Sequence, residues 1–384
     1  MKLSVNKEQI IEGLQKAAAI IPAKAGAAYL RSIWLKAEKG SLSIMATDAN
    51  IEFTGRYPAE VKQPGLIGVQ GRAFVDLVRQ LPAGVLQLTL DESTGNLLLE
   101  QGRRTYKLPV SGAEWFQNFS EFPAESPVTW SGDFLQDVLD RVVFCISDDD
   151  ATDAITCLYM KPCGNGRIDV CGLNGHQFAL VSFTHDDLAA RLPEEGVLIP
   201  KKYLQDMKKW LGVDEIELNI TDKRLYLRTL DGAESLSVPR AGHDYPDYTV
   251  FMSRLEGDGV SLLTVNRKEA IEALGRIQIF NTDSDRCAYL DLGDNEVRLS
   301  AQGQDTGSAN ESLEVTYRGD ISRIAFPTRN LMDVLGHFSS PSVDMILTGA
   351  EGPCGIRGSE DNEYTVIIMP MKISESTYYS EEDV

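Results

Sequence analysis

The chain has 384 residues, with 57 acidic side chains against 37 basic ones and a formal net charge of −20. This length predicts about two or three domains, and the excess of acid argues against nonspecific adhesion of the whole surface to nucleic acid or anionic membrane. No segment approaches the ~18 apolar residues of a membrane helix, and the N-terminal "MKLSVNKEQ" lacks the apolar region of a signal peptide. We therefore expect a cytoplasmic protein without a membrane partner.

The reactive side chains show no pattern that indicates a metal site or a catalytic motif. The six cysteines form no CxxC pair, and the four histidines never join a cysteine at zinc-ligand spacing. The chain also lacks a P-loop, a G-x-S-x-G motif, an HExxH motif and a dinucleotide-binding fingerprint. We expect reduced thiols, no metal, no cofactor and no enzymatic activity.

Six segments carry apolar residues at helical spacing, and they fall into three pairs along the chain. The pairs are 5–18 with 71–81, 131–143 with 200–211, and 265–277 with 327–338. Runs of alternating polar and apolar residues, typical of strands, follow each of the six segments. Asn6 and Asn266 stand where a helix N-cap is expected, with Gln9 and Glu269 three residues later, as in a capping box.

This order predicts an α+β protein built from three copies of one unit, each with two helices packed on antiparallel sheets. The predicted domains are 1–123, 124–251 and 252–373, because Pro, Ser, Gly and charged residues accumulate near 122–128 and 248–258. An acidic segment, 374–384, follows and is expected to be disordered. The alternative is an ordinary three-domain α+β protein whose parts resemble one another by accident.

Positive charge is concentrated on the predicted helices. The six segments together hold 13 Lys or Arg and 10 Asp or Glu, so the excess of acidic residues lies in the rest of the chain. In "PKKYLQDMKKWLG", residues 200–212, an apolar face lies opposite four lysines at positions 201, 202, 208 and 209. Helices on one side of the sheets would present these cations to a polyanion such as DNA, through sequence-independent phosphate contacts. Ordinary solvated helix faces are the alternative.

Four short motifs add a resemblance to this picture. "MKLSV" begins the chain, "GHQFA" occupies 175–179, "YPDY" occupies 245–248, and "VIIMPMKI" occupies 366–373. In this order and spacing the chain resembles the bacterial DNA polymerase III β subunit family, the sliding clamps. The resemblance implies two copies joined head-to-tail as a closed ring, with helices lining a hole that holds double-stranded DNA. It implies a non-catalytic processivity factor that also docks the replicative polymerase α subunit, the clamp loader and other clamp-binding-motif proteins.

The resemblance also assigns residues to the DNA and to the subunit contact. The family's DNA-contacting positions fall on Lys24, Arg72 and Lys202, with Lys201 beside Lys202 on the same predicted helix. The subunit contact falls on Tyr106, Ile279 and Phe280. We expect one edge strand of each copy to meet an edge strand of the other.

An apolar pocket between the second and third domains takes short partner peptides in this family. Methionines suit such a shared pocket because they repack around different ligands. Two positions depart from the family pattern: Gln177 stands where an arginine is common, and Asp285 stands where the residue is often aromatic. The matching pocket positions are Ile155, Leu173, Gly175, His176, Gln177, Phe178, Pro246, Phe251, Ile367, Ile368, Met369, Pro370, Met371 and Lys372.

The segment "SDDDATDAI", 147–155, replaces a loop that is usually polar, basic and aromatic in the family. Its carboxylates disfavour phosphate contact unless a cation bridges them. A solvated loop, a magnesium site and a metal-dependent nuclease site are the three interpretations. The carboxylates are Asp148, Asp149, Asp150 and Asp153.

Two further alternatives concern binding. A diverged clamp that binds proteins without closing on DNA would keep the pocket and lose the ring. The acidic segment 374–384 follows the pocket-lining strand directly, so Tyr378 and Tyr379 would be placed to fold back into the pocket.

Overall fold

The computed structural model describes residues 1–384 except 23–26, 126, 149–153, 284, 304–305 and 374–384. The chain divides into two compact units. Unit 1 combines Met1–Leu139 with Asp186–Gly242, and unit 2 combines Asp140–His185 with His243–Val384. None of the helices in the described ranges combines the length and the apolar character that a membrane crossing requires. The predictions for Lys24, Asp149, Asp150, Asp153, Tyr378 and Tyr379 lie outside the described residues.

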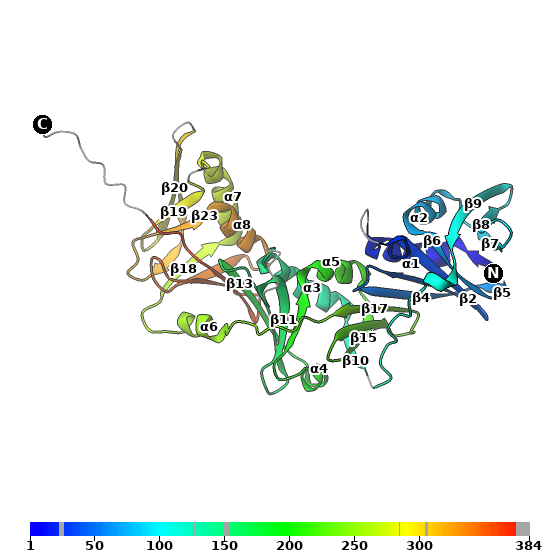
Figure 1. Cartoon of the computed structure of the whole chain (residues 1–384). Coiled ribbons are helices and arrows are strands. Elements are labelled where there is room, and N and C mark those ends of the chain that lie inside the picture. Colours follow the sequence, from blue (N-terminus) through cyan, green and yellow to red (C-terminus); the bar gives the residue numbers. More distant parts are fainter. Residues whose placement is uncertain (23–26, 126, 149–153, 284, 304–305, 374–384) are drawn as a thin grey trace, which may run out of the picture. The chain divides into compact units, whose positions relative to one another are not determined.

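Unit 1 is built on one antiparallel sheet of thirteen strands (Figure 1). Some strands, such as Lys2–Asn6 and Asn96–Gln101, alternate buried and more exposed residues, as expected for strands with one face on the core, whereas Ser32–Glu38 and Ser41–Thr47 are buried over most of their length. In sheet order they are β10 (Val128–Ser131), β15 (Glu215–Ile220), β16 (Arg224–Thr229), β17 (Glu234–Pro239), β4 (Glu52–Pro58), β3 (Ser41–Thr47), β2 (Ser32–Glu38), β6 (Gly65–Gln70), β9 (Arg104–Ser111), β8 (Asn96–Gln101), β7 (Val85–Asp91), β1 (Lys2–Asn6) and β5 (Glu60–Gln63).

The long helices of unit 1 lie on the same side of β2, β4 and β17 (Figure 1). Their apolar faces reach a core in which Trp34, Phe53 and Phe74 are fully buried. The helical segments are α1 (Lys7–Ile20), η1 (Ala28–Arg31), α2 (Gly71–Gln80), η2 (Ala113–Trp115), α4 (Asp186–Arg191) and α5 (Lys201–Trp210); the short strand β14 (Val197–Pro200) leads into α5, and α3 (Gly132–Val142) begins in this unit.

Unit 2 contains a larger and a smaller antiparallel sheet. The strands of the larger sheet follow the order β11 (Cys157–Pro162), β12 (Arg167–Leu173), β13 (Gln177–Thr184), β26 (Tyr364–Ile368), β25 (Cys354–Gly358), β24 (Ser342–Leu347), β18 (Ser261–Asn266) and β22 (Thr316–Arg318). The smaller sheet contains β21 (Gly307–Glu314), β20 (Glu296–Gly303), β19 (Cys287–Leu292) and β23 (Arg323–Pro327). The helical segments are η3 (Val143–Cys145), η4 (Ala154–Thr156), α6 (Thr249–Leu255), α7 (Arg267–Ile277), η5 (Gln278–Phe280) and α8 (Thr328–Gly336).

One backbone arrangement recurs three times along the chain. The strand before the first helix of each pair runs antiparallel to the strand after the second helix, as β1 with β7, β10 with β15, and β18 with β24. The first helical residue then donates its N–H to a carbonyl just before that later strand. These bonds are Lys7 to Gly84 at 3.0 Å, Gly132 to Asp214 at 3.0 Å, and Arg267 to Pro341 at 2.9 Å. The repeat is therefore present in hydrogen bonding as well as in sequence pattern.

Side chains from the first helices of two pairs close the ends of the second helices. The last carbonyls of a helix have no partner inside it. Lys7 Nζ donates to the carbonyl of Leu81, where α2 ends, and Gln136 Nε2 donates to the carbonyl of Leu211 at 2.6 Å, where α5 ends. Different side chains thus perform the same function in two copies of the repeat.

The six predicted helices and the α+β class are confirmed. Asn266 accepts a hydrogen bond from the Glu269 N–H at 3.1 Å, as predicted for a cap, whereas the Asn6 side chain makes no capping bond. The prediction for Asn6 is therefore wrong. Helix α6 lies inside 248–258, where the sequence indicated only a linker.

Candidate functional site

Helix α5 is amphipathic in the way its sequence predicts. Its buried side chains are Tyr203, Leu204, Met207 and Trp210, which recur at helical spacing. Lys202 lies on the exposed side, with Nζ 4.7 Å from the ring centroid of Tyr203. The ammonium therefore lies over the Tyr203 ring on the exposed side of α5.

Charge around α5 is partly balanced by nearby carboxylates. Lys209 Nζ lies 3.4 Å from the Asp206 carboxylate one turn earlier. Burial raises the pKa of Asp206, and the Lys209 ammonium opposes this rise by favouring the charged carboxylate. Lys209 is therefore partly neutralised by a half-buried carboxylate, whereas Lys202 lies at the exposed side of the helix.

Arg72 lies in the first turn of α2 and is exposed. The turn is stabilised by Gln70, whose side chain accepts a hydrogen bond from the Ala73 N–H at 2.7 Å. The structure thus places Arg72, Lys201 and Lys202 in unit 1, on helices that cover the same side of its strands (Figure 1).

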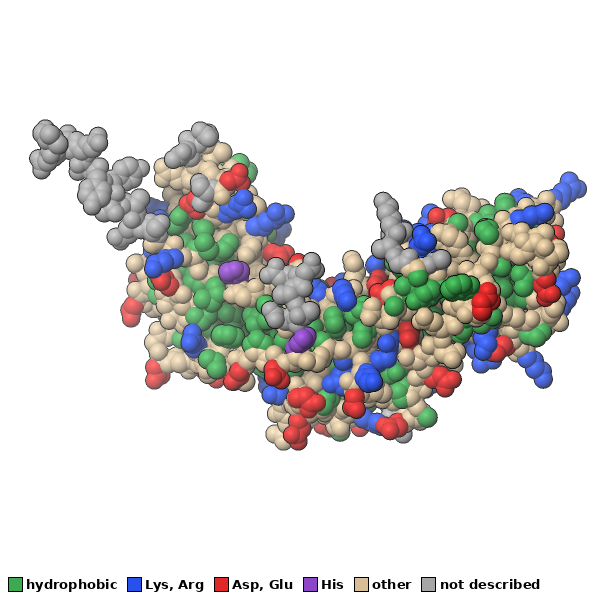
Figure 2. Space-filling model, viewed as in Figure 1, with side chains coloured by type: hydrophobic (Ala, Val, Ile, Leu, Met, Phe, Trp, Pro, Cys, Tyr) green, Lys and Arg blue, Asp and Glu red, His purple; other side chains and the backbone are tan. Residues whose placement is uncertain are grey.

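In unit 2, the strands β13 and β26 bring two distant sequence motifs together. Gln177 pairs with Ile368, and Phe178 pairs with Ile367, in antiparallel register. Beyond the paired residues, the Met369 N–H donates to the His176 carbonyl at 2.9 Å. The "GHQFA" and "VIIMPMKI" motifs therefore form one site, which we name the β13–β26 junction. Figure 2 shows apolar side chains gathered on the face of unit 2 that is turned to the viewer, beside the region that Figure 1 labels β13.

Aromatic side chains form a wall beside this junction. The Phe178 ring stacks on Tyr248 with centroids 5.6 Å apart and lies 6.5 Å from Phe251. The Tyr248 hydroxyl donates to the buried Asp169 carboxylate at 2.8 Å, which fixes the ring. Burial, with help from nearby anionic groups, raises the pKa of Tyr248, so the hydroxyl remains a neutral donor.

The predicted pocket residues separate into three groups by exposure. The exposed residues, which are available to a ligand, are Gly175, His176, Pro246, Met369, Met371 and Lys372. Half-buried residues are Ile155, Leu173, Phe251 and Pro370. The buried residues, which form the floor, are Gln177, Phe178, Ile367 and Ile368. Met369 and Met371 are 37% and 45% exposed, which is large for apolar side chains.

Gln177 has a structural set of partners. Its Oε1 accepts from Asn174 Nδ2 at 3.1 Å, and its Nε2 donates to the Asn330 carbonyl in α8 at 3.5 Å. Only 6% of the residue is exposed. Gln177 therefore connects the turn before β13 to α8 through its side-chain hydrogen bonds.

That turn has a geometry that glycine favours. The Asn174 side chain accepts from the backbone N–H groups of His176 and Gln177 at 3.0 and 2.8 Å. Gly175 between them has φ of +86°, and an added Cβ would meet no atom within 4 Å. Backbone conformation, and not crowding, therefore favours glycine at this position.

The residues predicted for the subunit contact lie near sheet edges. Tyr106 is half-buried in β9, where Arg104–Pro109 pair with β8. Ile279, in η5, is 70% exposed, and Phe280 beside it is half-buried. Near η5 runs β21, an edge strand of the smaller sheet, whose Glu311 accepts from Arg276 Nε at 3.0 Å.

Asp285, the second departure from the family pattern, makes its hydrogen bonds within unit 2. Its carboxylate accepts from the Cys287 N–H at 3.1 Å and from the Tyr289 hydroxyl at 2.9 Å. Burial raises the pKa of the Cys354 thiol and of the Cys171 thiol, which disfavours their thiolate forms. Across the described residues no three His, Cys, Asp or Glu side chains are arranged to hold a metal ion.

Three residues of the aromatic wall were not among the predicted site residues. Tyr159 stacks on Tyr245 with centroids 4.4 Å apart and lies 6.4 Å from Tyr248. The motif "YPDY" contains two of them, so the signal was present in the sequence. Only its proline was assigned to the pocket, because the stacking depends on β11, which lies far away in the chain.

Comparison with known proteins agrees with the fold and with the motifs. A family model described as the DNA polymerase III beta subunit, N-terminal domain, matches residues 1–120, and its C-terminal counterpart matches residues 257–372. A protein of Caulobacter vibrioides named beta sliding clamp is 24% identical over 379 residues, which cover 97% of this chain and 100% of the relative. A beta sliding clamp of Pseudomonas aeruginosa is 24% identical over 378 residues, with the same coverage.

Solved structures show the same architecture. The pol III beta structure of Caulobacter crescentus superposes with a TM-score of 0.89 at 23% identity, and the beta subunit of Pseudomonas aeruginosa superposes with a TM-score of 0.88 at 22% identity. Each alignment covers 97% of this chain and 100% of the other chain. With both terminal domain models matched, the chain belongs to the bacterial DNA polymerase III β-subunit family.

Proposed function

We propose that this chain is a DNA sliding clamp, a ring of two copies that encircles double-stranded DNA and tethers the replicative polymerase to it. Its relatives are named sliding clamps, a non-catalytic class, so the protein is not an enzyme. The observation that carries the proposal is α5, which buries its apolar face in unit 1 and directs lysines away from the core. We place the protein in the cytoplasm, where its DNA substrate would lie.

The DNA contact would involve Lys24, Arg72, Lys201 and Lys202. Arg72 and Lys202 are exposed on two helices of unit 1. Lysine and arginine bind phosphate without reading sequence, and they release counterions as they do so. Such contacts keep a ring on the duplex without fixing it at one position. The net negative charge of the rest of the chain would repel DNA from other surfaces.

Closure of the ring would join β9 of one copy to β21 of the other. Arg104 and Lys107 are exposed on β9, whereas Glu314 is exposed on β21. In the described part of the chain only Val110 and Ser111 of β9 pair with β6, so Arg104–Pro109 have one free edge, and opposite charges on this edge and on the edge strand β21 favour their pairing. Tyr106, Ile279 and Phe280 supply the apolar part of the contact. A dimer would have twice the 42.3 kDa mass of one chain in solution.

The β13–β26 junction would be the docking site for partner peptides. Exposed methionines beside a fixed aromatic wall suit apolar anchors of several shapes. Partners of this site would be the replicative polymerase α subunit, the clamp loader and other proteins with a clamp-binding motif.

The proposed domains are 1–123, 124–251 and 252–373, followed by the segment 374–384. The threefold recurrence of the strand–helix hydrogen bond supports three copies. The two compact units divide the chain differently, because β10, β15, β16 and β17 continue the sheet of the first copy. Sheets that run across domain boundaries account for this difference.

Retention on DNA of two topologies tests the proposal. The protein is loaded onto a nicked circular plasmid with a clamp loader and ATP, isolated by gel filtration, and divided into cut and uncut samples. We expect the protein to remain on the circle and to leave after a restriction enzyme linearises it. Equal retention on both forms would contradict encirclement and favour a surface binder.

A further inference from the structure

Unit 1 contains a groove with a volume of about 1040 Å³. This volume lies just above the ~300–1,000 Å³ that is typical of ligand sites. α1, the end of α5, the end of β4 and the turn between β16 and β17 surround it. Its apolar lining residues are Tyr57, Pro58, Trp210, Leu211, Ile216, Leu230 and Ala233. Leu230 is 54% exposed, so part of this lining faces solvent.

The wall formed by Tyr57 is fixed in place. Its ring lies against Gly13 and Gly55, where an added Cβ would come within 1.8 and 2.4 Å of the Tyr57 hydroxyl oxygen. The hydroxyl donates to Glu234 at 2.7 Å. Burial and the adjacent Glu234 carboxylate raise the pKa of Tyr57, so the hydroxyl stays neutral. The groove is therefore pre-formed, which lowers the entropy cost of binding.

The buried indole N–H of Trp210, a residue of the groove lining, has no acceptor among the described residues. Only 5% of this residue is exposed. An indole N–H can only donate, and buried polar groups are nearly always paired. Lys16 Nζ lies 5.9 Å from the ring centroid and cannot accept. An acceptor carried by a ligand would complete the site.

The groove is negatively charged. Its lining includes five carboxylates against three cations. Lys16 pairs with Glu234 at 2.5 Å, and Lys209 pairs with Asp206 at 3.4 Å. The carboxylates of Glu12, Asp214 and Glu215 make no ion pair within the described part of the chain. The field that remains favours a cationic ligand.

We propose that this groove binds a short extended peptide of a partner protein, in which Lys or Arg residues flank one or two large apolar side chains. The apolar side chains contact Tyr57, Ile216 and Leu230, and a backbone carbonyl accepts from Trp210 Nε1. The Lys or Arg residues face Glu12 and Glu215. This site is separate from the β13–β26 junction and lies wholly within unit 1. It does not depend on ring closure or on DNA.

Selection from a phage library of random octapeptides tests this site. The full-length chain is the target, and peptides that also bind Leu230→Ser are removed first. Recovered peptides are then measured by fluorescence polarisation. We expect peptides that combine Lys or Arg with an aliphatic or aromatic residue, with affinity about fivefold weaker for Trp210→Phe, which keeps the ring and removes the donor. Val213→Ser is the matched control, because Val213 is 78% exposed and lies outside the groove lining.

A direct measurement follows the Trp210 indole itself. The chain has four tryptophans, so the ¹⁵N-indole signal of Trp210 is identified by its loss in Trp210→Phe. We expect that signal to move downfield when a selected peptide is added, as a new hydrogen bond requires. Recovery of no peptide that depends on Leu230, recovery of acidic peptides, or an unmoved Trp210 signal would each overturn the proposal.

Discussion

Two junctions of the molecule begin with the same turn and then diverge. In unit 1, where β4 pairs with β17, the Asp48 carboxylate accepts from the N–H groups of Asn50 and Ile51 at 2.8 and 2.9 Å. In unit 2, where β13 pairs with β26, Asn174 does the same. The residue after each acceptor has positive φ, 83° for Ala49 and 86° for Gly175. The backbone frame is thus nearly the same in both junctions.

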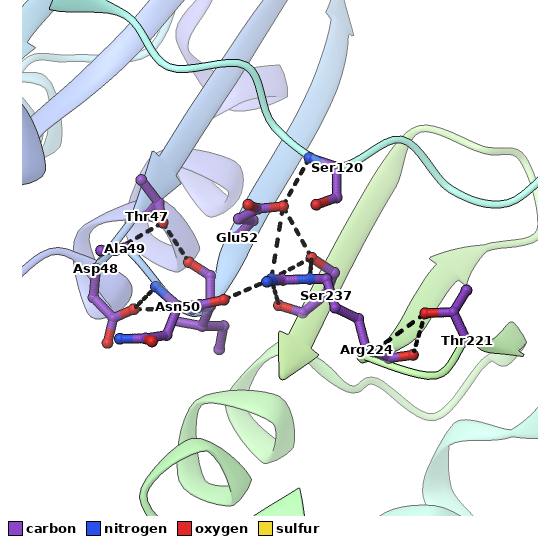
Figure 3. Close-up of polar contacts among 10 residues, drawn as sticks. Thr47, Asp48, Ala49, Asn50, Glu52, Ser120, Thr221, Arg224 and Ser237 are labelled. Atoms are coloured by element: carbon purple, nitrogen blue, oxygen red, sulfur yellow. Dashed lines mark hydrogen bonds and ion pairs between the residues drawn. The ribbon is translucent and has the colours of Figure 1, made fainter. Parts of the chain in front are cut away.

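The side chains that follow are different in kind. In unit 1, Glu52 accepts from the Ser120 N–H at 2.8 Å and lies 3.6 Å from the Arg224 guanidinium (Figure 3). Arg224 also donates to the Asn50 carbonyl at 2.6 Å and to Ser237 Oγ at 2.8 Å (Figure 3). In unit 2 the residue at the same position after the turn is Phe178, and Met369 and Met371 are exposed beyond β26. An ion pair with its hydrogen bonds closes the first junction, whereas apolar side chains leave the second one available to a ligand.

The largest expected effect comes from removing the aromatic side chain of each junction strand. Phe53 is 0% and Phe178 is 2% exposed, and each pairs with an aliphatic residue of the neighbouring strand. We expect Phe53→Ala and Phe178→Ala each to lower the free energy of unfolding by about 3–5 kcal/mol, because each leaves a cavity. Urea denaturation followed by circular dichroism measures this loss.

Peptide binding then separates the two variants. Under conditions in which both remain folded, only Phe178→Ala should lose affinity for a labelled clamp-binding peptide of the polymerase α subunit. Unit 2 contains the Phe178 site and Phe53 belongs to unit 1. An equal loss of affinity in both variants would place the docking site elsewhere or indicate a general change of structure.

The second effect concerns the ion pair that closes the unit 1 junction. The side chains of Arg224 and Glu52 are only 16% and 17% exposed. Arg224→Met should therefore lower the free energy of unfolding by about 2–3 kcal/mol, since it leaves a mostly buried carboxylate without its cation. The double variant Glu52→Leu/Arg224→Met should recover most of this loss, because both charges are then absent. Thermal and urea unfolding of the four proteins in the cycle measure the coupling, and additive losses would contradict it.

Sequence pattern predicted six helices and most of the strands because their periodicity is local. It predicted neither α4 nor α6, and the Pro, Ser, Gly and charged residues around α6 indicate a linker. It also left open which of the predicted pocket residues would be buried. Gln177 is buried because β13 pairs with β26, and because its amide meets Asn330 in a helix far along the chain.

The sequence pattern also did not predict the Arg224 contacts that close the unit 1 junction. Arg224 appears there as one more charged residue in an alternating strand. Its function depends on the Asn50 carbonyl, which is 174 residues away. Contacts of this kind are set by the pairing of β17 with β4, and no local propensity reports that pairing.

A smaller effect, confined to binding, comes from the rim of the unit 2 junction. Met369→Ala should weaken the clamp-binding peptide by about 1–2 kcal/mol, because the side chain is 37% exposed and available to a ligand. The free energy of unfolding should change little, since an exposed side chain contributes little to the core. Calorimetric titration and urea unfolding measure the two quantities. Loss of stability equal to the loss of binding would assign Met369 to the core.

The smallest expected effect is a change of stability at acid pH. It concerns a carboxylate that is buried at the end of each junction opposite the turn. Glu234 begins β17 and is bonded to Tyr57 and Lys16, whereas Asp361 precedes β26 and accepts from the N–H groups of Ser339 and Ser340 at 3.0 and 2.9 Å. Burial alone would raise the pKa of Asp361, but the hydrogen bonds of these serines outweigh burial and hold that pKa below its usual range.

A carboxyl group with a lowered pKa in the folded state binds fewer protons than in the unfolded state. Its contribution to stability is therefore complete above about pH 4, near the unfolded pKa, and is lost as pH falls through the folded pKa. We expect Asp361→Asn to cost about 1 kcal/mol at pH 7, and the difference from the wild-type protein to narrow below about pH 4. Unfolding free energies measured from pH 2.5 to 7 follow this change. Asp258→Asn, at an exposed position of unit 2, is the control, and an Asp361→Asn difference that stays constant with pH would assign its cost to packing instead of charge.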